Sequence, residues 1–401
     1  PAVQPVQRPR PDQGRLMAQP VTIEAEFGGK DSFVDLTGRT VSFSISRGRQ
    51  DYTQPFQTGR ATVVMRNLDG ELDPDNSAGT YFGEILTGRR IRITSNEGSL
   101  LYEQRLYLGF IEDFTLDYDI GGDAIVTISC VDGLSELAQR EIADGTAVVE
   151  QTTGARVTAI LNLTEVDYSG AVNISTGQST CEAGTASGNA LTYLHQVERT
   201  EQGALFVNKA GVLRFLDRYE LLADSTVTFS DDGSDTDYEA LRRLVTATEL
   251  YNRLAANRPS QADVIEDDAT SQTTYGVRYL DLGEVFFGSD AEVTDMLDYA
   301  LVRYANQSPR IAEVTTLLDS KSTIAVSQLC QLELSESATV EFTPPNVSQI
   351  SIECSIESIR HDYTVGGGWR LTFGFTPRDV SSYLRLDDAV LGKLDSNVLG
   401  F

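Results

Sequence analysis

Short runs of alternating apolar and polar residues occupy both ends of the chain, and this period of two predicts strands with one buried face. In residues 40–45, for example, valine, phenylalanine and isoleucine alternate with threonine and serine. Turn-forming residues separate the runs, as at 67–70 (NLDG) and at the glycine pair 121–122. The predicted strands lie at 40–45, 61–65, 90–94, 113–118, 126–130, 350–357 and 369–375. Many short strands separated by turns favour a sandwich or a barrel.

The middle of the chain has the period of amphipathic helices as well as strands. The predicted elements are a short helix with apolar positions from Leu134 to Ile142 capped by Asp132, a helix at 155–163, a helix after Ser187, and a hairpin over 203–218. A longer helix over 290–304 begins with the capping box Ser289-x-x-Glu292. The predicted fold class is therefore mainly β with α+β insertions.

Two of the predicted hairpins resemble each other in sequence. Residues 111–128 align without a gap on residues 356–373 at a constant offset of 245, and seven of the 18 positions are identical. The matched glycines are common in hairpin turns and carry little weight, but the matched Ile-Glu and Asp-Tyr pairs stand in register. We therefore expect two related β domains within one chain, and three such chains would present six similar domains around an axis.

The chain is strongly acidic, with 32 basic against 59 acidic residues in 401 and a net charge of −27. This balance argues against a nucleic-acid-binding surface, which depends on Lys and Arg. Two interpretations of the charge are open: it keeps the protein in solution, or part of it lines a passage through which DNA slides without sticking. The length allows two to four domains. The sequence shows no apolar run long enough to span a membrane and no secretory signal, so we expect a soluble protein.

Catalytic chemistry has little support in the sequence. The only histidines, His195 and His361, lack a second histidine at metal-binding spacing, and no nucleophile-elbow motif accompanies them. Gly29-Lys30 lacks the remaining residues of a phosphate-binding loop. With 59 carboxylates, pairs at glycosidase-like separation arise by chance and cannot be ranked. We therefore expect no enzyme, and assign no catalytic or cofactor-binding residue and no cofactor.

Metal sites are also not expected. The acidic loop 231–237 has oxygen ligands suited to Ca²⁺ but lacks the distal glutamate of an EF-hand, so a solvated turn is favoured. A second group with ligand-like side chains is assigned to turn structure: Asn67, Asp69, Glu71 and Asp73. The four cysteines have no paired spacing and are predicted to be free thiols: Cys130, Cys181, Cys330 and Cys354.

Several motifs, in a fixed order, resemble the minor tail proteins that form the tail hub of phages (baseplate hub or tail tip). They are ISRGR (45–49), PFQTGRATVVMRNLDGELDP (55–74), YFGEILTGRRIRI (81–93), LYLGFIEDF (106–114), SGNALTYLHQVERTEQGALFVNKAGVLRFLDR (187–218), YNRL (251–254), YGVRYL (275–280) and LDDAVLGKLDSNVLGF (386–401). The likeness covers about 350 residues. Each motif alone is turn chemistry, but their order is specific.

The resemblance implies two tube-like β-barrel domains that flank a small α/β insertion domain. The expected divisions are an extended basic arm at 1–20, a first β-barrel domain at 21–132, the insertion domain at 133–245, a second β-barrel domain at 246–380 including the helix 290–304, and a C-terminal tail at 381–401. The arm is either disordered or lies along a neighbouring acidic subunit.

The implied function is structural. The chain would form a homotrimeric ring at the tail tip that joins the sixfold tail tube or distal ring to a threefold central fibre or spike, beside the tape-measure protein. DNA would pass through the ring without specific binding, and the virion component would assemble in the host cytoplasm. Alternatives are a hexameric distal tail ring protein and a tail-associated cell-wall hydrolase.

Overall fold

A computed structural model gives the structure of this chain and describes residues 21–50, 53–95, 103–119, 124–222, 227–233, 236–244, 249–305 and 310–378. The predicted arm (1–20) and tail (381–401) lie outside the described residues. Within the described ranges, none of the helices is both long and apolar enough to cross a membrane.

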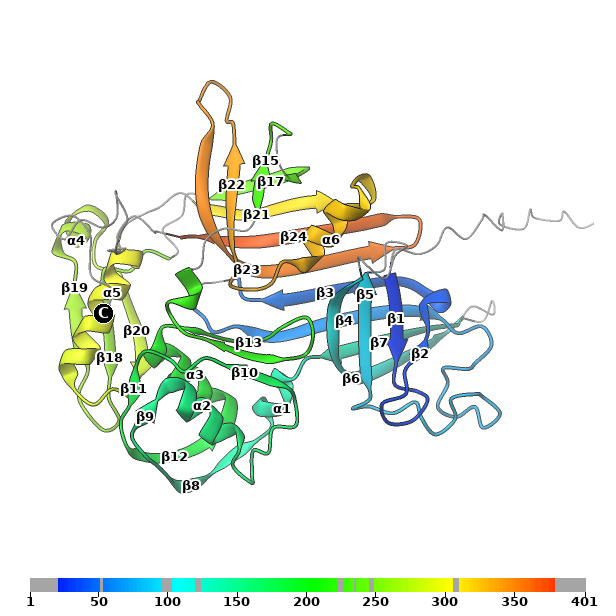
Figure 1. Cartoon of the computed structure of the whole chain (residues 1–401), viewed down its shortest axis with the longest axis horizontal. Helices are drawn as coiled ribbons and strands as arrows, with labels where there is room; N and C mark the ends of the chain where they lie inside the picture. Colours follow the sequence, from blue (N-terminus) through cyan, green and yellow to red (C-terminus); the bar gives the residue numbers. More distant parts are fainter. Residues whose placement is uncertain are drawn as a thin grey trace, which may run out of the picture.

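The described elements confirm a mainly β protein (Figure 1). The strands of the large sheet are β1 (Val21–Ala25), β2 (Val34–Asp35), β3 (Thr40–Gly48), β4 (Gln57–Arg66), β5 (Arg90–Ser95), β6 (Gln104–Tyr118), β7 (Ala124–Val131), β15 (Thr228–Ser230), β16 (Thr236–Asp237), β17 (Ala240–Leu244), β21 (Arg310–Leu317), β22 (Ser337–Phe342), β23 (Ile350–Thr364) and β24 (Gly368–Pro377). The other strands are β8 (Glu141–Val148), β9 (Gln151–Thr152), β10 (Val172–Ile174), β11 (Thr180–Cys181), β12 (Gly184–Asn189), β13 (Ala204–Val207), β14 (Leu213–Leu216), β18 (Arg253–Asn257), β19 (Val264–Asp267) and β20 (Tyr279–Glu284). The α-helices are α1 (Leu134–Ala138), α2 (Thr153–Leu161), α3 (Ala190–Glu201), α4 (Ala269–Tyr275), α5 (Asp290–Tyr304) and α6 (Thr323–Gln331).

The large sheet contains two five-stranded antiparallel units with the same topology. Module A consists of β3, β4, β5, β6 and β7, which pair in the order β3-β4-β7-β6-β5. Module B consists of β17, β21, β22, β23 and β24, which pair in the order β17-β21-β24-β23-β22. If the strands of each module are numbered one to five along the chain, their order across the sheet is one, two, five, four, three in both modules. The modules join where β3 pairs with β23, so these two strands run side by side across the molecule (Figure 1).

The two hairpins also share their register, including a β-bulge. Phe114 faces Ile128 in module A, and Ile359 faces Phe373 in module B, which is the offset of 245 that the sequence alignment gives. The register of each hairpin shifts at the same place, after Ile111 in module A and after Ile356 in module B. A bulge conserved at the same position in two units is a designed feature of a strand. The predicted repeat is therefore confirmed in three dimensions.

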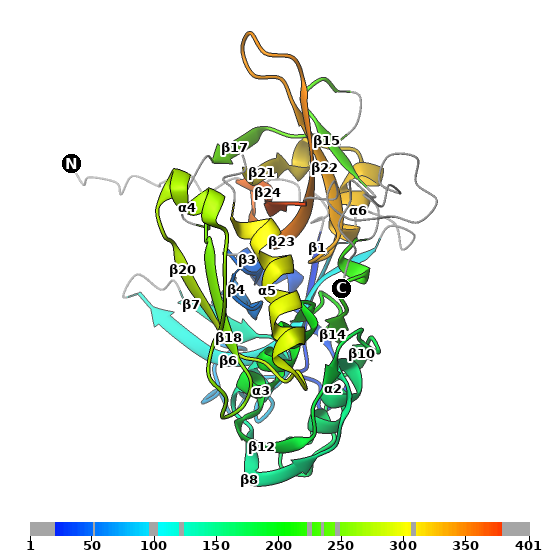
Figure 2. The same cartoon turned by 90° about the vertical axis from the view of Figure 1, so that its left-hand side faces the viewer.

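Three hydrophobic clusters organise the described residues. The inner faces of both modules, helix α6 and part of the hairpin β13–β14 share the largest cluster. The helices α1 to α3 pack with strands β8 to β14 in a second cluster. Helix α5 packs on the sheet β19-β18-β20 in a third, and this unit is inserted between the first and second strands of module B (Figure 2).

Several local expectations needed correction. Helix α1 ends at Ala138, and Ile142 lies in strand β8 instead of on the helix. Gly133 occupies the N-cap of α1, while the Asp132 side chain accepts hydrogen bonds from the backbone amides of Gly59 and Leu134. Among the described strands, the pairing closes no barrel, because β2, β16 and β17 each end the sheet on one side. The capping box predicted for α5 is present.

Candidate functional site

The join between the modules is a continuous antiparallel ladder. Residues 358–364 of β23 pair with residues 42–48 of β3 in reverse order, from Ser358 with Gly48 to Thr364 with Ser42. The backbones approach closely at the bulge of β23. A Cβ atom on Gly48 would lie 2.1 Å from the carbonyl oxygen of Glu357, and the φ of Gly48 is +107°. Only glycine suits this position, which fixes the place where the modules meet.

Two buried ion pairs seal this join. Arg49 Nε lies 2.7 Å from a carboxylate oxygen of Glu357, which is the bulge residue of β23. Arg47 Nη1 lies 2.6 Å from a carboxylate oxygen of Glu333, and the Arg47 side chain is 3% exposed. Because a buried charge without its partner is strongly unfavourable, these pairs tie the orientation of module A to that of module B.

The hairpin β13–β14 contributes a third charge to the join. Lys209 at its turn donates from Nζ to the backbone carbonyls of Cys330 and Leu332 at 2.8 and 3.2 Å, and its backbone amide donates to Glu333. Burial lowers the pKa of Lys209. Although burial alone raises the pKa of Glu333, the charges of Arg47 and Lys209 hold it below its usual value. The hairpin β13–β14 is thus fixed beside the join by the charged cluster of Arg47, Lys209 and Glu333.

Among the described residues, no strand lies against the corresponding edge of module A. Strand β5 pairs with residues 104–110 of β6 and no further. Over residues 113–118, β6 therefore pairs with β7 alone among the described strands. Glu112, the counterpart of the buried Glu357, is exposed and pairs with the exposed Arg60 at 3.3 Å. Tyr118 is 59% exposed, whereas its counterpart Tyr363 is 7% exposed and stacks on Phe43 with ring centroids 5.2 Å apart. A long open edge is a template for another strand.

A matching open edge lies at the far end of module B. Strand β17 occupies the place in module B that β3 occupies in module A, and in the described residues it pairs only with β21. Its sequence is Ala-Leu-Arg-Arg-Leu, and most of its side chains are exposed. Within the described ranges, module A and module B therefore each have an open edge, at opposite ends of the paired modules.

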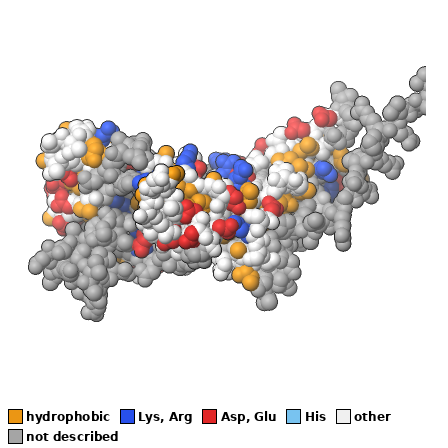
Figure 3. Space-filling view, turned by 90° about the horizontal axis from the view of Figure 1, so that it is seen from above, with side chains coloured by type: hydrophobic (Ala, Val, Ile, Leu, Met, Phe, Trp, Pro, Cys, Tyr) orange, Lys and Arg blue, Asp and Glu red, His pale blue; other side chains and the backbone are white. Residues whose placement is uncertain are grey.

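The sheet face that points away from the large core is rich in hydroxyl groups. Its serine and threonine side chains are Ser42, Ser44, Ser46, Thr62, Thr115, Thr127, Ser129, Thr315, Thr364 and Thr372. Its charged side chains are of both signs and include Arg60, Arg66, Arg242, Arg360 and Arg370 with Glu112, Asp113, Asp117, Glu313 and Asp362. Six of these charges meet in three ion pairs across or along strands, as Arg242 with Glu313 at 2.9 Å illustrates. On the surface seen in Figure 3, acidic and basic side chains are likewise interspersed among uncharged ones. The excess negative charge is therefore not concentrated on this sheet face.

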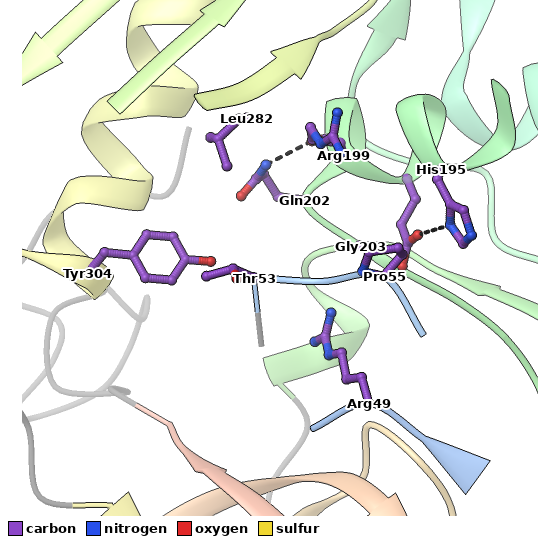
Figure 4. Close-up of a pocket in the computed structure, with 10 residues that line it drawn as sticks. Arg49, Thr53, Pro55, His195, Arg199, Gln202, Gly203, Leu282 and Tyr304 are labelled. Atoms are coloured by element: carbon purple, nitrogen blue, oxygen red, sulfur yellow. Dashed lines mark hydrogen bonds and ion pairs between the residues drawn. The ribbon is translucent and has the colours of Figure 1, made fainter. Parts of the chain in front are cut away.

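The two histidines lie in different surroundings. His361 is buried and accepts a hydrogen bond from Trp369 Nε1 at 3.3 Å, and burial followed by the charges of Arg47 and Lys209 lowers its pKa to about 3. His195 lies 2.8 Å from Glu198 beside a cavity of about 70 Å³ (Figure 4). That volume holds a few water molecules.

A groove lies between module A and the insertion. It measures about 520 Å³ and is lined by the β1–β2 loop with Lys30, the β5–β6 strands, and the segments around Tyr168 and Gly211. Asp132 lies nearby but is 2% exposed, and burial raises its pKa to about 7. A carboxyl group with a raised pKa is often functional. Here both oxygens accept backbone amides, so Asp132 holds β4 against α1.

The metal-like side chains serve turns. Asn67 accepts from the amide of Leu72 at 2.9 Å, and Asp73 accepts from the amide of Asp75 at 2.9 Å. Asp231 holds the backbone amide of Thr343 at 2.6 Å. Across the described residues, no three histidine, cysteine or acidic side chains form a group able to hold a metal ion. All four cysteines are buried free thiols.

Comparison with known proteins identifies the fold. A scan of the sequence against profiles of protein families finds no match, and a search of curated proteins finds none. Among solved structures, the chain is similar to a tail protein from Neisseria meningitidis, with a TM-score of 0.59, 11% identity, and 90% of this chain and 97% of that chain covered. It is also similar to the 43 kDa tail protein of prophage MuSo2 from Shewanella oneidensis (TM-score 0.57, 13% identity, 89% and 96% covered). A third similar structure is the prophage tail protein gp18 from Listeria monocytogenes (0.52, 12%, 90% and 95%).

The fold is thus that of phage tail proteins, and the resemblance seen in the sequence motifs is confirmed.

Sequence reasoning missed the residues that join the modules. The segment ISRGR was recognised only as a motif, although its two arginines bind Glu333 and Glu357, which lie 286 and 308 residues away. One signal was present, since Glu357 belongs to the matched Ile-Glu of the repeat. The open strand β17 gave no signal, because its five residues do not alternate.

Proposed function

We propose that this chain is a structural subunit of a phage tail tip, a tail hub protein that forms a homotrimeric ring. The observation that carries the proposal is the pair of five-stranded modules with one topology and one register in a single chain. Three chains place six such modules around an axis, so a threefold ring presents a nearly sixfold surface. This is the geometry needed to join a sixfold tail tube or distal ring to a threefold central fibre or spike.

The fold shared with phage tail proteins supports a tail-associated role over enzymatic chemistry. In this proposal, each module is one wall segment of the tube-like domains that the resemblance implies, and neighbouring copies complete the wall. The tape-measure protein and the distal tail or tail tube protein are the proposed partners, in a virion component assembled in the host cytoplasm. The basic arm at 1–20 and the C-terminal tail at 381–401 are proposed contacts to those neighbours.

The hydroxyl-rich sheet face is the proposed wall of the DNA passage. Its arginines alternate with carboxylates, so phosphate groups meet no continuous basic surface. This differs from the passage lined by excess acid that the net charge of −27 suggested. On this face, DNA would slide because the charges are balanced and the hydroxyl groups are uncharged.

The mass of the purified full chain in native mass spectrometry tests the proposal. We expect three times the 43.8 kDa of one chain. A hexamer would favour a distal tail ring, and a monomer at every concentration up to the solubility limit would contradict a ring. Zymography on host cell walls addresses the hydrolase alternative, and a cleared zone that survives repurification would contradict a purely structural role.

A further inference from the structure

The open edges of β6 in module A and β17 in module B correspond, strand for strand, to the two edges that meet inside the chain. Strand β6 occupies in module A the place that β23 occupies in module B, and β17 occupies in module B the place of β3. Inside the chain, β23 and β3 pair. We infer that β17 of one copy pairs antiparallel with the outer edge of β6 in the next copy, and so repeats the internal join between subunits. This inference rests on the proposed ring and names its interface.

The internal join fixes the register of the pairing. At the offset of 245, Asp362 and Tyr363 of β23 correspond to Asp117 and Tyr118 of β6. The second strands of the two modules, β4 and β21, can be matched because they pair with equivalent positions of β7 and β24. The first strands are then matched through β4 and β21, so that Phe43 of β3 corresponds to Leu241 of β17, and Ser44 corresponds to Arg242.

Asp362 pairs with Ser44, and Tyr363 pairs with Phe43. Asp117 of one copy therefore faces Arg242 of the next, and Tyr118 faces Leu241.

The charges of the two edges are complementary. The outer edge of β6 carries the exposed acids Asp113 and Asp117, whereas β17 carries the adjacent exposed arginines Arg242 and Arg243. Opposite charges directly across an antiparallel pair stabilise it, and two copies of the same edge would bring like charges together. Basic β17 therefore selects acidic β6 over a second β17, which gives a head-to-tail contact that can close into a ring.

The apolar side chains are complementary as well. The buried stack of Tyr363 on Phe43 has no counterpart within module A, where Tyr118 is 59% exposed. The Tyr118 hydroxyl donates a hydrogen bond to Asp73 at 2.5 Å, while its ring stays largely in contact with solvent. Leu241 from the next copy would cover the ring of Tyr118 in the position that Phe43 takes over Tyr363. The exposed aromatic ring thus gains the same kind of cover.

Cysteine cross-linking of the full-length chain tests this register. In the variant Asp117→Cys/Arg242→Cys, each copy places one thiol opposite a thiol of the next, at the Cα separation of about 4.5–5.5 Å found across antiparallel pairs. The four native cysteines are buried and remain in place. We expect most chains to become covalent dimers and trimers on mild oxidation, and to return to single chains on reduction.

Two matched variants control the experiment. Ser44→Cys/Asp362→Cys places the same pair at the internal join, so it must cross-link within one chain and shows that this position accepts a disulfide. Asp113→Cys/Arg242→Cys moves one thiol four residues along β6, about 13 Å away, and is expected to give at least tenfold less intersubunit product.

The outcomes separate the interface from the ring. A trimer by native mass, with a positive internal control but no intersubunit product for the 117–242 pair, would overturn this interface and leave the hub proposal intact. Equal products for the 113–242 and 117–242 pairs would overturn the register. A chain that stays monomeric would contradict the ring itself, and the interface with it.

Discussion

Modules A and B have the same strands in the same register, yet they differ at the edge next to the bulge. In module B, β3 covers the edge, Glu357 is 5% exposed and Tyr363 is 7% exposed. In module A, no described strand covers it, Glu112 is exposed and Tyr118 is 59% exposed. The neighbour of module B thus comes from the same chain. In the proposed ring, the neighbour of module A is the next copy of the chain, so one folded chain displays both a finished join and an unfinished one.

The bulge glutamates give the largest expected difference between the modules. Glu357→Ala removes the partner of buried Arg49 and should lower the free energy of unfolding by about 3–5 kcal/mol. Glu112→Ala removes an exposed ion pair and should cost less than about 1 kcal/mol. Urea unfolding of the two variants under identical conditions measures both values. Equal losses would mean that the internal join is not held by this buried pair.

The tyrosines should differ in the same direction. Tyr363→Ala removes a buried ring that stacks on Phe43 and should destabilise the chain by about 3–5 kcal/mol, at the lower end because the site is at the edge of the core. Tyr118→Ala should cost less than about 1.5 kcal/mol in the monomer, chiefly the hydrogen bond to Asp73.

Oligomer formation, in contrast to monomer stability, should be sensitive to the exposed Tyr118. Tyr118→Ala is expected to weaken trimer formation at least tenfold in analytical ultracentrifugation, because Tyr118 is proposed to be covered by the next copy. An unchanged association constant for Tyr118→Ala would show that this edge stays open in the assembly.

Closing the space at Gly48 should disturb only the internal join. Gly48→Ala would place a Cβ atom 2.1 Å from the carbonyl oxygen of Glu357 at a φ of +107°, and should cost about 2 kcal/mol or more. Gly88→Ala is the matched control, because its φ is also positive and no atom lies within 4 Å of the added Cβ. Thermal unfolding compares the two. If Gly88→Ala lowers stability as much as Gly48→Ala does, the positive φ and not the contact with Glu357 causes the loss of stability.

The smallest expected effect is on the pH dependence of stability, through a histidine in module B whose counterpart in module A is a leucine. His361 corresponds to Leu116, and burial lowers the pKa of His361 from 6.5 to about 3. The unfolded chain takes up a proton on this histidine near pH 6.5, whereas the folded chain does so only near pH 3. Its contribution to stability is therefore complete above pH 6.5 and is lost progressively as the pH falls toward 3.

His361→Leu should flatten this part of the stability profile, although Trp369 loses its hydrogen-bond acceptor. Denaturation at pH 7 and pH 5 gives the slope for each protein. A slope as steep as that of the unchanged chain would assign the acid sensitivity to other groups.

The sequence predicted the parts of the fold that depend on local patterns. Alternation and glycine turns located the two hairpins, and the repeat gave their register to the residue. The capping box at Ser289 gave the start of α5. These features are set by residues that are close in the chain, so a single sequence contains the information.

The long-range pairings were not predictable in the same way. The backbone amide and carbonyl groups at the edge of β3 could pair with many strands. The pairing of β3 with β23 depends on how the core as a whole is packed, and not on local sequence. The unit of β18 to β20 with α5 interrupts module B, which hid the equivalence of β17 with β3. The equivalence of β17 with β3 therefore depends on the pairing of the whole sheet and has no local signal in the sequence.

Electron cryo-microscopy of the purified oligomer tests the central claim most directly. The account predicts three copies around one axis, with six modules in a ring and β17 of each copy beside residues 113–118 of the next, so that internal and intersubunit joins alternate. A ring whose copies meet through other surfaces, or six copies with one module each at the axis, would contradict it.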